Sequence, residues 1–288
     1  MTDLLDAPVI DGPGVYDIPE DAYHADPVPG GSLSSSGARR LLPPSCPAIF
    51  RHEQLNPPGP KKAFDLGSAA HRLVLGSGPE LVRIDADEWR TKEVKEQVAA
   101  VRAGGGIPLK PAEYRQVHDM AAALRRHPVA AALFDPAHGQ PEQTLIWQDD
   151  DTGISCRARL DWQPDAKPGR RLIVPDYKTC RSASPRAIAK AVHEHGYHQQ
   201  TEWYLRGAQA LDLADGDAAF VFVFQEKDPP YLVTVVQLDD EALHVARERN
   251  RRAMETYAAC VEADHWPGYS DDIELITLPA WATREENL

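Results

Sequence analysis

Apolar and polar residues alternate over short stretches in the middle of the chain, and apolar residues recur with helical spacing on both sides of it. Alternation predicts strands, because successive strand side chains point to opposite faces, whereas recurrence every three to four residues predicts helices. The strand-like stretches are 142–148, 154–162, 172–179, 218–225 and 231–238. The helix-like stretches are 32–42, 61–76, 87–103, 111–127, 184–193, 197–212 and 239–262.

The order of these elements predicts an α/β protein with a central mixed β-sheet flanked by helices. Prolines and glycines concentrate in the first sixty residues, so 1–60 is expected to be a loosely structured segment with one short helix. We expect the regular core to span 61–265 and a tail to follow at 266–288.

Composition narrows the class of protein. The 288 residues include 31 Lys and Arg against 44 Asp and Glu, a net charge of -13, which disfavours indiscriminate coating of nucleic acid. A local basic channel or bound divalent cations can still reverse the potential at one site. No apolar run is long enough to cross a membrane and no signal peptide is evident, which predicts a soluble, cytoplasmic protein. The four cysteines are far apart, so we expect reduced, mostly buried thiols rather than disulfides or a metal cluster: Cys46, Cys156, Cys180 and Cys260.

Charged residues stand on two of the predicted strands. In "LIVPDYKTC" (172–180), Asp176 and Lys178 point to the same face at the end of an otherwise apolar strand. In "ISCRARLDW" (154–162), the apolar residues share one face and Arg157, Arg159 and Asp161 share the other. Such charges form either structural ion pairs or a catalytic site.

The turn between the two strands suggests how they pair. "KPGR" (167–170) fits a type II turn, and an antiparallel hairpin closed by it would set Asp161 opposite Asp176 and Arg159 opposite Lys178. Opposed carboxylates about 5 Å apart repel unless a cation lies between them, and hard oxygen ligands favour Mg²⁺ or Mn²⁺. A wider loop would give another pairing, and the aspartates would then be ordinary ion-pair partners of the neighbouring basic residues.

Four short motifs in fixed order carry a family resemblance. "GSAAH" (67–71), "RARLD" (157–161), "PDYKT" (175–179) and "QTEWY" (200–204) together resemble the PD-(D/E)xK nuclease superfamily in its RecB-like branch. With "GGSLSSSGARRLL" and a Pro-rich break upstream, the chain looks most like the phage exonuclease VIII (RecE-type) exonucleases. The resemblance implies a restriction-endonuclease-like core.

The resemblance also implies roles for individual residues. His71, Asp161 and Asp176 would bind the divalent metal, with the backbone carbonyl of Tyr177 as a further ligand, and Lys178 would assist catalysis. Gln200 and Tyr204 match the family's Q-x-x-x-Y motif. From the residues themselves, Arg157 and Arg159 could hold the adjacent phosphate, and Glu142, which opens the preceding strand, could be a ligand or a supporting carboxylate.

The implied function is a Mg²⁺- or Mn²⁺-dependent DNA exonuclease that digests linear duplex ends, 5′ to 3′, in phage-type recombination with a single-strand annealing partner. Its oligomeric state stays open, a homo-oligomer being one option. Two other classes also stay open: a degenerate nuclease fold that grips DNA ends without cutting, and a metal-dependent hydrolase of small phosphate esters, which the acidic charge would suit. The histidines of "HEHGYH" (193–198) lack the spacing of a zinc site on one helix face, which favours solvated or DNA-facing side chains.

Overall fold

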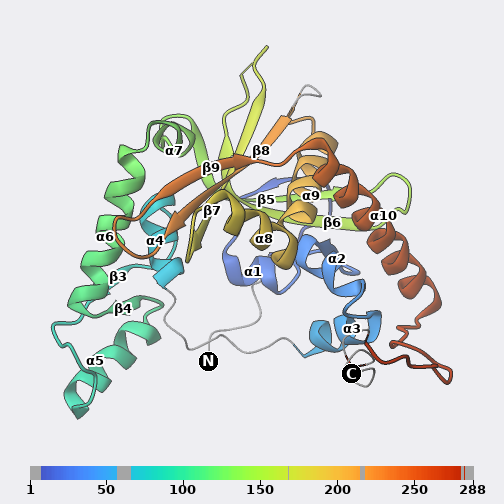
Figure 1. Ribbon diagram of the computed structural model, residues 1–288, viewed down its shortest axis with the longest axis horizontal. Coiled ribbons are helices and arrows are strands. Elements are labelled where there is room, and N and C mark those ends of the chain that lie inside the picture. Colours follow the sequence, from blue (N-terminus) through green and yellow to red (C-terminus); the bar gives the residue numbers. More distant parts are fainter. Residues whose placement is uncertain (1–7, 57–65, 168, 215–217, 280–281, 283–288) are drawn as a thin grey trace.

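The computed structural model describes residues 8–56, 66–167, 169–214, 218–279 and 282 (Figure 1). Its first sheet has the order β1-β5-β6-β2. The long antiparallel pair β5 (Gly139–Gln148) and β6 (Ser155–Pro164) forms its centre. Short edge strands β1 (Gly14–Tyr16) and β2 (Leu33–Ser34) flank that pair, β2 running parallel to β6. In β6 the apolar face is buried as the alternation predicts.

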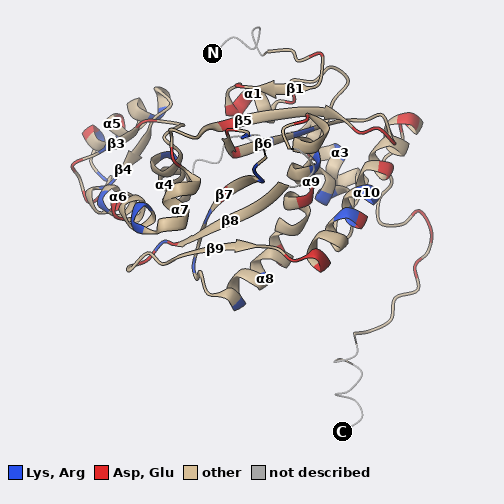
Figure 2. Ribbon diagram, turned by 90° about the horizontal axis from the view of Figure 1, so that it is seen from above, with Lys and Arg blue, Asp and Glu red and all other residues tan. Residues whose placement is uncertain are grey.

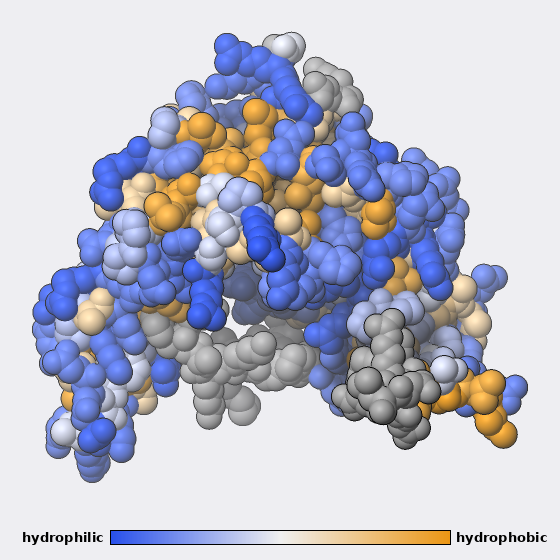
Figure 3. Space-filling model, in the orientation of Figure 1, coloured by the Kyte–Doolittle hydropathy of each residue, from blue (hydrophilic) through white to orange (hydrophobic). Residues whose placement is uncertain are grey.

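The second sheet has the order β7-β8-β9. β7 (Leu172–Cys180) runs parallel to β8 (Ala218–Glu226), and β9 (Val233–Gln237) runs antiparallel to β8. β8 is apolar on both faces and buried along nearly its whole length, as expected for a central strand covered on two sides. In Figure 3, apolar residues gather on the face where β8 and β9 lie, and the adjoining Leu232 is 54% exposed.

Helices cover the two sheets. The crossover from β7 to β8 consists of α8 (Pro185–His195) and α9 (Tyr197–Ala210). The long helix α10 (Asp240–Ala263) packs against α9, and it also contacts α2 (Ser35–Leu41) and α3 (Pro47–Leu55). On the other side lie α4 (Leu66–Leu75), α6 (Pro111–Arg126) and α7 (Pro128–Leu133). Beyond them, β3 (Leu81–Arg83), β4 (Ile107–Leu109) and α5 (Lys92–Ala103) form a small lobe, which Figure 2 shows beside the sheets.

Close packing fixes α9 against the first sheet. A Cβ added to Gly207 would lie 2.8 Å from the Trp147 ring, so only glycine lets the helix approach this closely. The Trp203 indole nitrogen donates a hydrogen bond of 3.0 Å to the carbonyl of Arg157 on β6. These contacts hold α9 at a fixed height over the strand that carries Asp161.

The predicted mixed α/β class with flanking helices is confirmed, and the strands and long helices lie within a few residues of their predicted positions. The predicted thiols are also confirmed as free, three of them buried and Cys180 half-buried. Within the described residues, no helix is long and apolar enough to span a bilayer.

The predicted hairpin between β6 and β7 is wrong. The described residues of the predicted turn have turn geometry: the amide of Arg170 donates to the carbonyl of Lys167, and Gly169 has a φ of +71°. Pro168 lies outside the described residues. However, β6 pairs with β5 and β2, and β7 pairs with β8. The expected facing of Asp161 with Asp176, and of Arg159 with Lys178, therefore does not occur through a strand ladder. β8 occupies one edge of β7, and at the other edge the Tyr177 amide donates to the Asp161 side chain instead of to the backbone of β6.

The described part of the N-terminal segment is built into the fold. β1 and β2 extend the first sheet, and α1 (Glu20–His24) packs beside it, with Ala22 and Tyr23 buried. Residues 1–7 and 57–60 of the predicted loose segment lie outside the described residues. Sequence composition indicates turns here, but it does not reveal that short strands between those turns pair with the core.

Candidate active site

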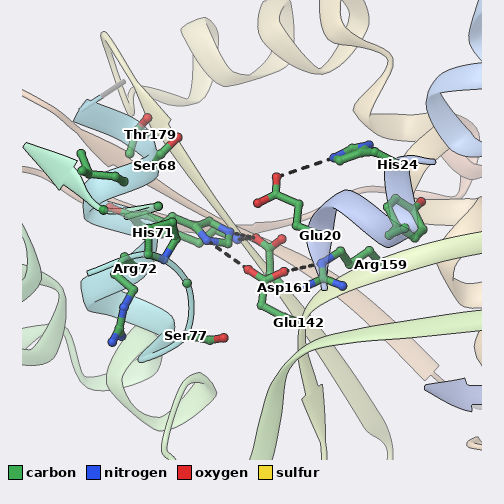
Figure 4. Close-up of a pocket in the computed structure, with 18 of the residues that line it drawn as sticks. Glu20, His24, Ser68, His71, Arg72, Ser77, Glu142, Arg159, Asp161 and Thr179 are labelled. Atoms are coloured by element: carbon green, nitrogen blue, oxygen red, sulfur yellow. Dashed lines mark hydrogen bonds and ion pairs between the residues drawn. The ribbon is translucent and has the colours of Figure 1, made fainter. Parts of the chain in front are cut away.

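A cleft of about 1000 Å³ opens where α4, β5, β6 and β7 meet (Figure 4). It brings together side chains from all four elements: His71 from α4, Glu142 from β5, Asp161 from β6 and Lys178 from β7. The small lobe and α1 complete its walls. These four residues, which the sequence analysis assigned to a metal-dependent site, are distant in the chain and lie together at the cleft.

Asp161 joins three elements. Its Oδ2 accepts a 2.8 Å hydrogen bond from the backbone amide of Tyr177 on β7 and lies 3.1 Å from Nε2 of His71 on α4. The carboxylate therefore occupies the place where a backbone carbonyl would stand if β6 and β7 formed a ladder. Despite burial, His71, Lys178 and the Tyr177 amide favour the charged form and lower the pKa of Asp161 to about 2.

His71 lies between two carboxylates. Its Nδ1 is 3.4 Å from Glu142, opposite the Nε2 contact with Asp161. Burial opposes a charged imidazole, yet the carboxylates of Asp161, Glu142 and Asp176 outweigh it and raise the pKa of His71 to about 9. The protonated ring donates to Asp161 through Nε2 and supplies positive charge between the two carboxylates.

Glu142 has strained backbone geometry at the cleft. Its φ of +60° interrupts the ladder between β5 and β6 at the position across from Asp161, since Pro141 pairs with Trp162 and Gln143 with Leu160. A non-glycine residue in this region costs roughly 1 kcal/mol or more, and such strain clusters at functional sites. Burial raises the pKa of Glu142, while His71 and Arg159 act against that rise.

Asp176 is the most buried of the carboxylates, with 1% of its side chain exposed. Its Oδ2 lies 2.6 Å from Nζ of Lys178, and its Oδ1 accepts a 2.6 Å hydrogen bond from the Gln200 amide. Burial and the neighbouring Asp161 charge outweigh Lys178 and raise the pKa of Asp176 to about 6. The same carboxylates raise the pKa of Lys178 in spite of its burial, so this amine stays charged at neutral pH.

The donor set suits a hard divalent cation in its chemistry. The Asp176 Oδ2 atom is buried and lies 2.6 Å from the Lys178 ammonium group. Such an oxygen, with Asp161 and an imidazole nearby, is a ligand set that Mg²⁺ or Mn²⁺ accepts. Within the described residues, however, no three of these side chains stand close enough to hold an ion as they are, since His71 is bonded to Asp161 and Glu142. Metal binding therefore requires His71 to release those contacts.

The two arginines predicted to hold a phosphate are occupied by protein groups. Arg157 is paired with Asp26 at 2.8 Å, donates to Ser32, lies over the Tyr23 ring and is absent from the cleft wall. Arg159 reaches the wall, but it donates to Glu142 and to the carbonyl of Ile18. These contacts favour a structural role for Arg157 and a supporting role for Arg159 beside Glu142.

Other basic and hydroxyl side chains line the cleft, and the sequence reasoning did not find them. Arg72 adjoins His71 on α4, and Arg102 comes from the C-terminal end of α5. Hydroxyl groups of Ser68, Ser77 and Thr179 lie on the same wall. Of these residues, only Arg72 could have been found from the sequence, because it directly follows His71 of the GSAAH motif. The lobe that supplies Arg102 carries no motif.

The Q-x-x-x-Y pair reaches the site from α9. Gln200 binds Asp176, and Tyr204 lines the cleft, where burial and the nearby carboxylates raise its pKa well above the usual range. Tyr177 turns its ring away, and its hydroxyl donates to Gln225. Of the "HEHGYH" histidines, His193 and His198 stack at 6.4 Å without any group of three metal ligands forming among the described residues.

The fold and the cleft define the class of the protein. Asp161 and Lys178 at one cleft, with the buried Asp176 beside Lys178 and a helix histidine beside Asp161, form the arrangement of a PD-(D/E)xK nuclease-like domain. The chain belongs to the family described as PDDEXK-like domain of unknown function (DUF3799), whose model matches residues 34–279. The predicted superfamily is thereby confirmed.

A solved structure supports the fold. An exonuclease candidate from Eubacterium rectale matches with a TM-score of 0.58 at 15% identity, covering 95% of this chain and 100% of its own. An alkaline exonuclease from Laribacter hongkongensis matches more weakly, with a TM-score of 0.28 at 13% identity over 67% of this chain and 89% of its own, too little to carry an argument. No curated protein sequence matches.

The two aspartates should respond oppositely to neutralisation in metal-free protein. The pKa of Asp176 is raised in the fold, so its ionisation costs stability as pH rises from about 4 through 6, and Asp176→Asn should stabilise the apo protein more at pH 8 than at pH 5. The pKa of Asp161 is lowered, so its charge stabilises the fold above about pH 4, and Asp161→Asn should destabilise it at pH 8.

Urea unfolding in EDTA at pH 5 and pH 8 measures both effects. Equal shifts of the two variants in the same direction would show that the carboxylates are not electrostatically distinct. Asp165→Asn, on the loop after β6, serves as the control variant and should shift neither curve by more than about 0.5 kcal/mol.

Proposed function

We propose that the protein is a divalent-metal-dependent exodeoxyribonuclease that hydrolyses phosphodiester bonds from linear duplex ends. The single observation that carries the proposal is the meeting of Asp161 and Lys178 at one cleft, with the buried carboxylate of Asp176 2.6 Å from the Lys178 ammonium group. The family and the fold support a nuclease. Digestion from 5′ to 3′, a place in phage-type recombination and a single-strand annealing partner rest on the RecE-type resemblance alone, and the oligomeric state stays open.

The metal would be held by Asp161 and Asp176, with His71 and the Tyr177 carbonyl as further ligands, and would supply an activated water and charge neutralisation at the phosphate. Lys178 lies beside Asp176 and lines the cleft, so its ammonium group can stabilise the negative charge that develops on the phosphate or orient the attacking water. Gln200 donates a hydrogen bond to Oδ1 of Asp176 and so restricts the rotation of that carboxylate. Glu142 offers a proton acceptor for His71 when that ring releases Asp161.

Two other functions give different results in one experiment. A DNA-end binder would protect linear duplex without shortening it, and a small-ester hydrolase would ignore DNA. The intact carboxylates and lysine disfavour the binder.

End dependence is tested with three forms of the same plasmid. Linear duplex should shorten with Mg²⁺ or Mn²⁺ and stay intact in EDTA, whereas closed circular duplex should not be degraded. Degradation of nicked circles would show whether the enzyme can start at a single-strand break. Strand-specific end labels then give the polarity. Efficient cutting of closed circles at low enzyme concentration would contradict an exonuclease and indicate an endonuclease.

Lys178→Met should slow the chemical step while leaving binding intact. Loss of one preorganised cation at the phosphate is expected to reduce the single-turnover rate by about a hundredfold. Binding of DNA ends, measured with Ca²⁺ in place of Mg²⁺, should change little. In the ion-pair alternative Lys178 only neutralises the buried Asp176, and the substitution would instead lower the melting temperature and leave the rate of the surviving protein near normal.

Arg102 should contribute to DNA binding rather than to the rate. It lines the cleft on the lobe, away from the carboxylates, and is packed over the Trp89 ring at 5.9 Å. Arg102→Gln should weaken DNA affinity several-fold and reduce the slope of log affinity against log salt by about one, with the rate at saturating DNA unchanged. Arg90→Gln is the control, since Arg90 is exposed and paired with Glu88. Equal effects of both substitutions would mean that only net charge matters.

A further inference from the structure

Lys178 has a second neighbour besides Asp176. Its Nζ lies over the ring of Tyr197, 5.3 Å from the ring centroid. A cation at this distance is attracted by the negative face of the ring, most strongly where water is excluded, and the Lys178 side chain is only 22% exposed. The ammonium group is therefore held between a carboxylate and an aromatic face.

The Tyr197 ring is itself fixed by the core. It packs at 5.3 Å from Phe222 and 5.9 Å from Phe224, two buried residues of β8, the strand that pairs with β7. Its backbone position is set by Gly196, which adopts φ +67° to end α8 and start α9. An arginine side chain, Arg39, approaches Gly196 so closely that a Cβ there would lie 2.6 Å from its Cδ.

The first turn of α9 thus contacts both members of the Asp176–Lys178 pair. Tyr197 lies against the lysine, and Gln200, three residues later on the same side of the helix, binds the aspartate. The Q-x-x-x-Y motif accounts for Gln200 and Tyr204 but leaves Tyr197 without a role. Neither does Tyr197 line the cleft, so it does not touch a substrate there.

We propose that Tyr197 is a positioning residue, whose ring face holds the Lys178 ammonium group in the orientation required for phosphodiester hydrolysis. This inference rests on the proposed nuclease function. The ring, not the hydroxyl, carries the effect, because the contact is with the ring face and the hydroxyl makes no hydrogen bond to Lys178. Removing the ring frees Lys178 to turn away from the cleft while Asp176 keeps its place through Gln200.

Three variants separate positioning from packing. Tyr197→Leu should lower the single-turnover rate by about tenfold with DNA-end affinity unchanged, and Tyr197→Phe should stay within about twofold of the wild type. Tyr114→Leu removes another half-buried tyrosine ring, which lies tilted against His118 at 4.4 Å and outside the cleft wall, so it should lower thermal stability similarly without changing the rate. Equal rates in Tyr197→Leu and Tyr114→Leu would overturn the proposal.

A double-mutant cycle tests whether Tyr197 acts through Lys178. In a Lys178→Met background, Tyr197→Leu should cause no further loss of rate, because the group that the ring positions is gone. An additional tenfold loss would show that the ring acts on the fold or on another residue, and would overturn the assignment.

A spectroscopic measurement keeps the contact testable apart from cleavage. The ε-CH₂ signal of Lys178, assigned by its absence in Lys178→Met, should show an upfield ring-current shift in wild type and Tyr197→Phe that disappears in Tyr197→Leu. If the wild type cuts no DNA, the proposed function fails, and this shift alone decides whether the ring holds the lysine. An unshifted signal in the wild type would overturn the contact itself.

Discussion

The hydrogen bond from the Tyr177 amide to Asp161 is the interaction on which the site depends. β6 and β7 belong to different sheets, and this 2.8 Å bond replaces a main-chain ladder between them. Because a buried amide without a partner costs about as much as a lost hydrogen bond, the carboxylate of Asp161 is held in place by the needs of the backbone. The same oxygen then meets His71, so one atom fixes the relative positions of two sheets and a helix.

α9 supplies the second half of the arrangement. Gly207 and Trp203 seat the helix against the first sheet, while Gln200 and Tyr197 reach Asp176 and Lys178 on the second. One rigid helix therefore spans both sheets and sets the two charged residues of β7 relative to Asp161. This arrangement explains why a strand end with an aspartate and a lysine is stable although both are largely removed from water, since each has a partner besides the other.

The sequence predicts much of this protein because its periodic patterns and its motifs are local. Alternation in 154–162 correctly places the apolar face of β6, and the four ordered motifs bring His71, Asp161, Asp176 and Lys178 together. The strand pairing was not predictable from local signals: β7 pairs with β8, which is distant in sequence, and meets β6 through the Asp161 side chain instead of through a ladder. Arg157 was equally misleading, since its partner Asp26 lies in a segment whose composition suggested no fixed structure.

The charge of the cleft bears on how an acidic chain could accept the DNA proposed as its substrate. Four carboxylates, those of Glu20, Glu142, Asp161 and Asp176, stand in or beside the cleft, and Arg159 is taken up by Glu142. Without metal the compensating charges near Asp161 come from Lys178 and from a protonated His71, whose pKa the carboxylates raise to about 9. A phosphate that approaches the carboxylates near Asp161 would be repelled until further positive charge is bound there. The part of the wall with Arg72 and Arg102 would attract it. The structure thus separates a cationic binding wall from a carboxylate centre, and the divalent ion that the carboxylates would hold is what would make the centre accessible to the substrate.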